Sequence, residues 1–199
     1  MLGNPPLDRG RLGFIEYVKV SFSFLSKEYD FHVVKTEPTF VRYESSGVFV
    51  NIYHGRASFE LGFEIGRLDD RTGKEEPPYT LSMIVEHMGA KHRTGYTFFQ
   101  CSTRDSVKQC VPKLANLVQS YAPSFLSGDP AAYKQLLKTR SDIGERITKD
   151  FKLRAVREKA TSAWRARDYA QVADLYESIF GDLTRAEISK LNYSKGHSR

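Results

Sequence analysis

The spacing of apolar residues changes several times along the chain, and each change predicts a new element. Near the N-terminus, apolar side chains recur every three or four residues, which predicts a helix from Phe14 to Tyr29. The period then falls to two, and short turns that contain proline, glycine or serine separate the runs. This alternation predicts four strands, at residues 31–35, 39–44, 48–53 and 58–67.

The last of these runs has the clearest alternation. Its odd-numbered positions from 59 to 65 are apolar, whereas its even-numbered positions are glutamate or glycine. This pattern is typical of an antiparallel strand that is buried on one face and wet on the other. Because the connecting turns are short, a meander is the simplest topology. The wet face then carries Glu60, Gly62, Glu64 and Gly66.

Beyond the meander the pattern becomes mainly helical. A polar loop over 69–78 precedes a helix that Thr80 caps. A fifth strand is predicted at 96–101. Thr103 caps the next helix, and Pro112 is expected to kink or split it.

Strong helix-start signals divide the C-terminal part of the chain. Asp129 is a favoured N-cap, and Pro130 suits the first helical position. Another helix is predicted over 151–167, and capping boxes at 168–171 and 184–187 open two more. The sequence thus predicts an α+β fold: an N-terminal helix, an antiparallel β-meander of four or five strands, and a C-terminal helical region. The expected division is an α+β domain over 1–127 and a helical region over 128–199 that packs on it and does not fold independently.

Charge and composition narrow the class of protein. The chain has 199 residues, a net charge of +6 and 13% aromatic residues, which suits a folded domain with a real core. The two cysteines, Cys101 and Cys110, are expected to be reduced thiols. The first residues have neither the charged nor the apolar region of a signal peptide, and no apolar run is long enough to span a bilayer. We therefore expect a cytoplasmic protein that does not enter a membrane.

Motif searches favour a protein without catalytic activity. The sequence has no glycine-rich phosphate loop, no G-x-S-x-G elbow, no H-E-x-x-H and no kinase motif set. His87 and His92 bracket Gly89, but a third metal ligand is missing nearby. Cys101 would be a nucleophile only beside a histidine, and a buried thiol is the more ordinary interpretation. We predict no metal and no cofactor.

The wet face of the predicted sheet has two interpretations. Glu60 and Glu64 lie about 13 Å apart along the strand, too far for a glycosidase pair. Cross-strand charge pairing at a solvated surface is the ordinary explanation. The alternative is a recognition surface for a protein partner, because mixed charge and tyrosine suit such interfaces. The candidate partner-binding residues are Arg42, Asn51, Tyr53, Glu60 and Glu64.

A basic stretch offers a second candidate function. Residues 134–167 contain 11 Lys/Arg against 4 Asp/Glu, so they carry the excess positive charge. A solvated helix face is the ordinary explanation, and nucleic-acid binding is the alternative. Single-strand binding would need exposed aromatic rings, but Trp164 and Tyr169 are expected in the core, and Arg154, Arg157 and Arg165 are expected to spread around the helix. The candidate nucleic-acid residues are Lys149, Lys152, Arg154, Arg157 and Lys159.

A third hypothesis is an enzyme with a scattered site. Turn and strand residues near the middle of the meander would form a small polar cleft. The residues in question are His54, Arg56, Glu60 and Glu64.

The segments TFVRYE, VFVNIYHGR and FELGFEIGR, at 39–44, 48–56 and 59–67, resemble a pattern found in small uncharacterised bacterial α+β proteins. Some proteins of this kind resemble immunity proteins, which neutralise toxins. The resemblance extends to AWRARDY at 163–169, and this tail is also similar to one tetratricopeptide-like hairpin. It implies binding to another protein and assigns no site residues. Because the chain is basic, an immunity-like version is not expected to fill a cationic nuclease groove.

Overall fold

The structure is a computed structural model that describes residues 9–55, 58–69 and 72–197. It divides into two compact units, Met1–Thr139 and Arg140–Arg199, called here the sheet unit and the helical unit. The division falls after Thr139, further along the chain than the predicted boundary at 127/128. Tyr133 and Leu136 explain the shift, because both pack into the core of the sheet unit.

The sheet unit is built on the predicted antiparallel meander. Consecutive strands pair as hairpins in the order β1-β2-β3-β4. Two short strands, β5 and β6, then pair with opposite halves of β4. β6 keeps only two residues of the predicted fifth strand. The strands are β1 (His32–Glu37), β2 (Phe40–Ser45), β3 (Val48–His54), β4 (Glu60–Arg67), β5 (Tyr79–Thr80) and β6 (Phe99–Gln100).

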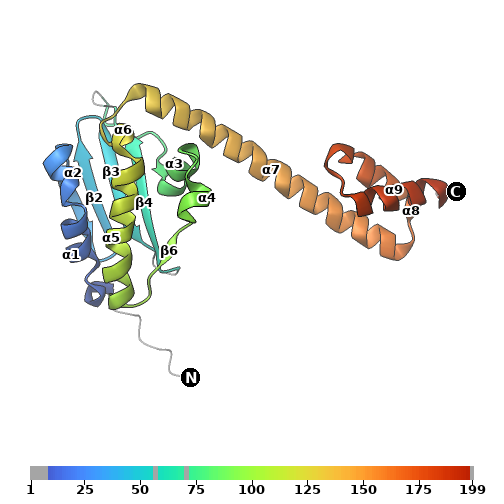
Figure 1. Ribbon diagram of the computed structural model, residues 1–199, viewed down its shortest axis with the longest axis horizontal. Coiled ribbons are helices and arrows are strands. Elements are labelled where there is room, and N and C mark those ends of the chain that lie inside the picture. The colour runs from blue at the N-terminus through green and yellow to red at the C-terminus, as the bar shows by residue number, and fades with distance from the viewer. Residues whose placement is uncertain (1–8, 56–57, 70–71, 198–199) are drawn as a thin grey trace, which may run out of the picture. The chain divides into compact units, whose positions relative to one another are not determined.

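Helices cover one face of this sheet. Figure 1 shows α1 and α5 crossing the face side by side. The core lies between the two layers, where Phe22 stacks on Phe63 with ring centroids 6.3 Å apart. The helices are η1 (Arg9–Leu12), α1 (Phe14–Ser21), α2 (Ser23–Glu28), α3 (Leu81–His87), α4 (Lys91–Thr94), α5 (Arg104–Tyr121) and α6 (Pro123–Leu126).

The helix starts predicted at Thr80 and Thr103 are confirmed. The Thr80 hydroxyl accepts a hydrogen bond from the Met83 amide at 3.3 Å, and Thr103 forms a reciprocal capping box with Ser106. The predicted split at Pro112 is wrong, because α5 runs through it as one helix. Pro112 is exposed, while buried residues before and after it hold both halves of α5 on the same core.

The long helix α7 (Pro130–Ala166) replaces two predicted helices. Residues 138–150 lack an apolar stripe, so periodicity gave no helical signal there. They also lack proline, and their lysine, arginine and glutamate residues favour a helix, so the first helix continues into the second. The predicted start is confirmed, since the Asp129 carboxylate accepts a hydrogen bond from the Ala131 amide at 2.9 Å.

The helical unit has a small core of its own. The last part of α7 packs with α8 (Tyr169–Glu177), η2 (Phe180–Asp182) and α9 (Arg185–His197). The capping box at 184–187 is confirmed, since Thr184 pairs reciprocally with Glu187, whereas at 168–171 only half of the box forms: Asp168 accepts from the Gln171 amide at 3.0 Å, and the Asp168 amide donates to the Ala163 carbonyl. Across the part of the chain that the structure describes, no helix is both long and apolar enough to cross a membrane. The buried residues are Ala160, Ala163, Val172, Ala173, Tyr176, Ile179 and Leu191.

Candidate functional site

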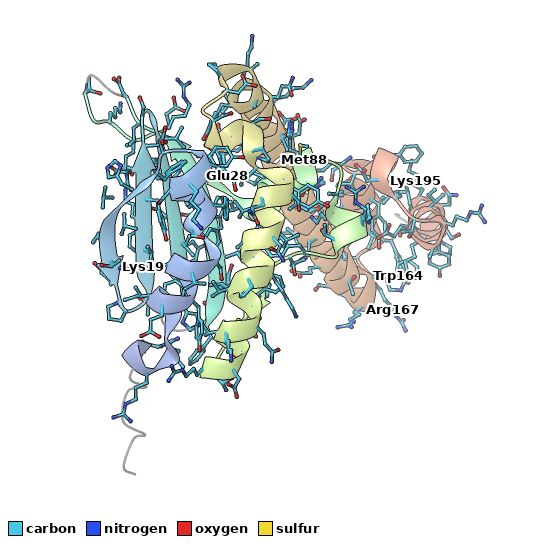
Figure 2. All side chains as sticks on the ribbon, turned by 60° about the vertical axis from the view of Figure 1, so that its left-hand side comes forward. Lys19, Glu28, Met88, Trp164, Arg167 and Lys195 are labelled. Carbon is cyan, nitrogen blue, oxygen red and sulfur yellow. The ribbon has the colours of Figure 1, made fainter. Side chains whose placement is uncertain are left out.

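The strand register brings the predicted partner-binding residues onto one face of the sheet. Arg42 is opposite Asn51, and Asn51 is opposite Glu64, so the three form a row across β2, β3 and β4. Tyr53 and Glu60 share this face by the alternation of each strand. The helices of the sheet unit lie on the other face, and in Figure 2 side chains project from the sheet on the side away from them.

Tyr53 has an unusual position on this face. A Cβ added at Gly62 would lie 2.1 Å from Cζ of Tyr53, so the ring occupies the space above the glycine. Because Glu60 and Glu64 are the next residues of β4 on the same face, the ring lies between their two carboxylates. Burial, followed by the charges of Glu64 and Glu60, raises the pKa of Tyr53 to about 12.

The two carboxylates differ from the other charges on this face. Glu64 accepts a hydrogen bond from the Asn51 side chain, yet burial still raises the pKa of Glu64 above its ordinary value. No cation in the described part of the chain forms an ion pair with Glu60 or Glu64. Lys35 pairs instead with Glu37 at 2.8 Å. Among the residues that the structure describes, the centre of the face therefore carries unpaired negative charge.

Arg42 is already occupied within the chain. Its guanidinium contacts Glu44 at 2.6 Å and Glu75 at 2.9 Å, and Cζ lies 4.4 Å from the centroid of the Phe49 ring. Only 13% of its side chain is exposed. Arg42 thus ties the loop that carries Glu75 to the sheet and balances two acidic groups. Its part in partner binding stays a prediction.

Sequence reasoning missed Tyr96, which comes close to the same group. Its ring packs edge-on against Phe99, with centroids 5.3 Å apart. Burial first, and then the nearby Tyr53 and Glu60, raises the pKa of Tyr96. β6 brings it there by pairing Gln100 with Glu60. This contact depends on a strand distant in sequence, so no local pattern could have indicated it.

The residues of the third hypothesis are not brought together. His54 faces the helical side of the sheet and is 1% exposed, whereas Glu60 and Glu64 lie on the opposite face. His54 Nε2 donates to the Cys101 carbonyl at 2.7 Å, and Nδ1 accepts from Arg9 at 3.3 Å. Burial lowers the pKa of His54, in keeping with this neutral, structural role. Arg56 lies outside the described residues.

His87 and Cys101 also lie within the packed framework, whereas His92 is exposed. His87 Nδ1 is 2.8 Å from the Thr139 hydroxyl. Among the residues that the structure describes, no group of three or more His, Cys, Asp or Glu could hold a metal ion. Burial, with a contribution from Cys110, raises the pKa of Cys101 to about 12, which disfavours the reactive thiolate.

The basic candidates on α7 have two different surroundings. Lys149 pairs with Asp182 at 2.7 Å, and Arg157 pairs with Glu187 at 2.7 Å, so both stabilise the helical unit. Lys152, Arg154 and Lys159 are exposed.

The arginines of α7 are gathered rather than spread. Arg154, Arg157 and Arg165 line one groove of about 680 Å³, together with Asp150 and Glu158. The expectation that they spread around the helix is wrong. Positions 154 and 165 are about three helical turns apart and so return to the same side.

Comparisons of this chain with protein-family models, with curated proteins and with solved structures found no match.

Proposed function

We propose that the protein is a non-enzymatic protein-binding module whose helix-free sheet face recognises a cationic surface on a partner protein. One observation carries the proposal: Tyr53 lies over Gly62 between two carboxylates that no described cation neutralises. We call Tyr53, Glu60 and Glu64 the acidic tyrosine patch.

The patch has the chemistry to bind a lysine or arginine side chain. A cation above a tyrosine ring gains about 0.5–1 kcal/mol, and more once water is excluded. The flanking carboxylates would pair with the same cation or with its neighbours. The patch is also preorganised, because Gly62 leaves room for the flat ring and Asn51 fixes the Glu64 carboxylate. Preorganisation reduces the entropy lost on binding.

The local charge explains how a basic chain can take a basic partner. The excess positive charge belongs to residues 134–167, whereas the patch is on the sheet. The net positive charge of the chain disfavours binding to a cationic target, but the acidic tyrosine patch would present negative charge to such a target. A role as an immunity or defence accessory protein is the specific form of this proposal that the resemblance suggests.

The first experiment is capture of the tagged, full-length protein from its native host, followed by affinity measurement with the purified partner. We expect one stoichiometric protein and little nucleic acid. The double variant Glu60→Lys/Glu64→Lys should weaken the affinity by about a hundredfold, because it places like charges together at the interface. Tyr53→Phe keeps the ring and should bind nearly as well as the wild type.

Glu28→Lys is the matched control, since Glu28 lies at the end of α2 in the helical layer (Figure 2). It reverses the same charge on the other side of the sheet unit and should leave affinity unchanged. Equal loss in both variants would indicate a general charge effect. Unchanged affinity in the double variant, with its fold intact by circular dichroism, would refute the proposal.

A further inference from the structure

The helical unit carries a group of aromatic rings that the sheet face does not involve. Trp164 lies in the last turn of α7, Tyr169 is the first residue of α8, and Tyr193 and His197 belong to α9. Ring centroids are 5.5 Å apart for Trp164–Tyr193 and 5.4 Å apart for Tyr169–Tyr193, while His197 stacks on Tyr193 at 4.0 Å. We call these four residues the aromatic cluster.

The aromatic cluster is accessible from solvent. Tyr193 is 46% exposed and His197 is exposed, while Trp164 and Tyr169 are half-buried. Trp164 packs against the edge of the small core, where Tyr176 is the buried ring among alanine and aliphatic side chains. Trp164 thus packs against the core without being enclosed by it, and the prediction that Tyr169 lies in the core is wrong.

Positive charge surrounds these rings. Lys190 Nζ lies 5.4 Å from the centroid of the Trp164 ring. Arg165 and Arg167 lie one and three residues after Trp164 in the chain, and both are exposed. Figure 2 shows Trp164 and Arg167 close together at the end of α7. Arg167 adopts φ 62°, a left-handed position after a helix where glycine is usual. An arginine there incurs a conformational cost that a glycine would avoid.

The nearby acidic groups are engaged. Asp168 caps α8 through the Gln171 amide. Glu177 pairs with Lys195 at 2.6 Å. Neither of these carboxylates forms a described ion pair with Lys190, Arg165 or Arg167. Arg165 also lines the groove on α7, together with Arg154 and Glu158.

We propose that the aromatic cluster binds single-stranded nucleic acid, with bases stacked on Tyr193 and Trp164 and phosphates held by Lys190, Arg165 and Arg167. Exposed rings beside cations are the arrangement that binds unpaired bases with little sequence preference. A duplex keeps its bases stacked internally and cannot use the rings. This proposal is independent of the acidic tyrosine patch, which lies in the other unit.

The test uses Trp164, the only tryptophan of the chain, as its reporter. An oligothymidine of roughly 15 nucleotides is titrated into the full-length protein. We expect saturable quenching of tryptophan fluorescence by the single strand. A duplex of the same length should bind more weakly and quench little. Affinity should fall log-linearly with salt between about 50 and 200 mM, because phosphate contacts release counterions.

Variants separate stacking from charge. Tyr193→Ala should weaken binding about tenfold, and Tyr193→Phe should restore it, because stacking needs the ring and not the hydroxyl. Phe98→Ala is the control, since it removes a ring that is 53% exposed in the sheet unit, and it should bind as the wild type does.

Three results would overturn the proposal. The first is the absence of saturable quenching of the wild type at low salt. The second is equal affinity for single strand and duplex. The third is a larger loss with Lys152→Glu/Lys159→Glu than with Tyr193→Ala, which would move the binding to the basic face of α7. The first two results come from the wild-type protein alone, so they test the proposal even if Tyr193→Ala fails to fold.

Discussion

The two units of this protein differ in how many of their aromatic residues they bury. In the sheet unit, Phe14, Phe22 and Phe63 are at most 1% exposed between the helices and the sheet. In the helical unit, Tyr176 is buried among alanine and aliphatic side chains, whereas Trp164, Tyr169 and Tyr193 remain at the edge of the core. A sheet with a helical layer leaves depth for several phenylalanine rings, whereas short helices that meet through small residues leave less. The sheet unit thus uses these rings for stability, and the helical unit leaves several of its rings accessible to solvent.

The largest expected effect comes from removing one buried ring of the sheet unit. Phe63→Ala should lower the free energy of unfolding of that unit by about 3–5 kcal/mol, since it loses burial and leaves a cavity beside Phe22. Circular dichroism follows both units during denaturation, whereas fluorescence of Trp164 follows the helical unit alone. In Phe63→Ala, we expect the circular-dichroism transition of the sheet unit to move to lower denaturant concentration, and the Trp164 fluorescence transition to stay where it is in the wild type.

Leu191→Ala is the complementary variant, because Leu191 is 1% exposed in the core of the helical unit. It should shift the Trp164 fluorescence transition and leave the circular-dichroism transition of the sheet unit unchanged. If either variant moves both transitions together, the two units unfold as one cooperative unit, and they do not have separate stabilities.

The elements predicted well from sequence are those fixed by neighbouring residues. Strand alternation in 58–67 located β4, and the cap at Thr103 located the start of α5. The residues on the helix-free face of the sheet were also predicted, because successive side chains of a strand point to opposite faces. These features need no knowledge of the rest of the chain.

The features that sequence missed depend on distant contacts or on missing patterns. The continuity of α7 was missed because its middle has no apolar stripe, although it lacks proline and its lysine, arginine and glutamate residues favour a helix. The position of Tyr53 between two carboxylates required the register of β3 against β4. Tyr193 joins Trp164 only because α9 folds back on α7, so the aromatic cluster could not be seen from spacing.

A smaller effect is expected where a ring is held at the surface of the sheet unit. Gly62→Ala puts a methyl group where the Tyr53 ring lies, so the ring must move away. We expect a loss of about 1–3 kcal/mol in the free energy of unfolding, as for other overpacked sites. Gly181→Ala is the control, because a Cβ there meets nothing within 4 Å and its φ is not left-handed. An unchanged stability of Gly62→Ala would contradict the packing.

The same variant changes the response to alkaline pH. The pKa of Tyr53 is raised to about 12 in the fold, so its contribution to stability is complete below the ordinary pKa of about 10 and is lost as the pH rises through 12. Gly62→Ala should expose the ring and lower this pKa, which ultraviolet titration of tyrosinate measures. A wild-type titration curve in the variant would show that the ring had not moved.

The smallest expected effect tests an ion pair of the helical unit. Glu187 contacts Arg157 at 2.7 Å and accepts a hydrogen bond from the Thr184 amide. Glu187→Gln keeps an oxygen for the cap and removes the charge, so we expect a loss of about 0.5–1 kcal/mol at neutral pH, read from Trp164 fluorescence. Glu158→Gln, at an exposed position of α7, is the control.

The pH dependence of this loss identifies its cause. The Arg157 guanidinium, chiefly through its hydrogen bond, holds the pKa of Glu187 below its ordinary value. A lowered carboxyl pKa stabilises the fold above the ordinary value and ceases to do so as the pH falls through the lowered one. The difference between the wild type and Glu187→Gln should therefore vanish in acid. A difference that persists there would assign the effect to the cap, and the helical unit would then be stabilised by its turns and not by its charges.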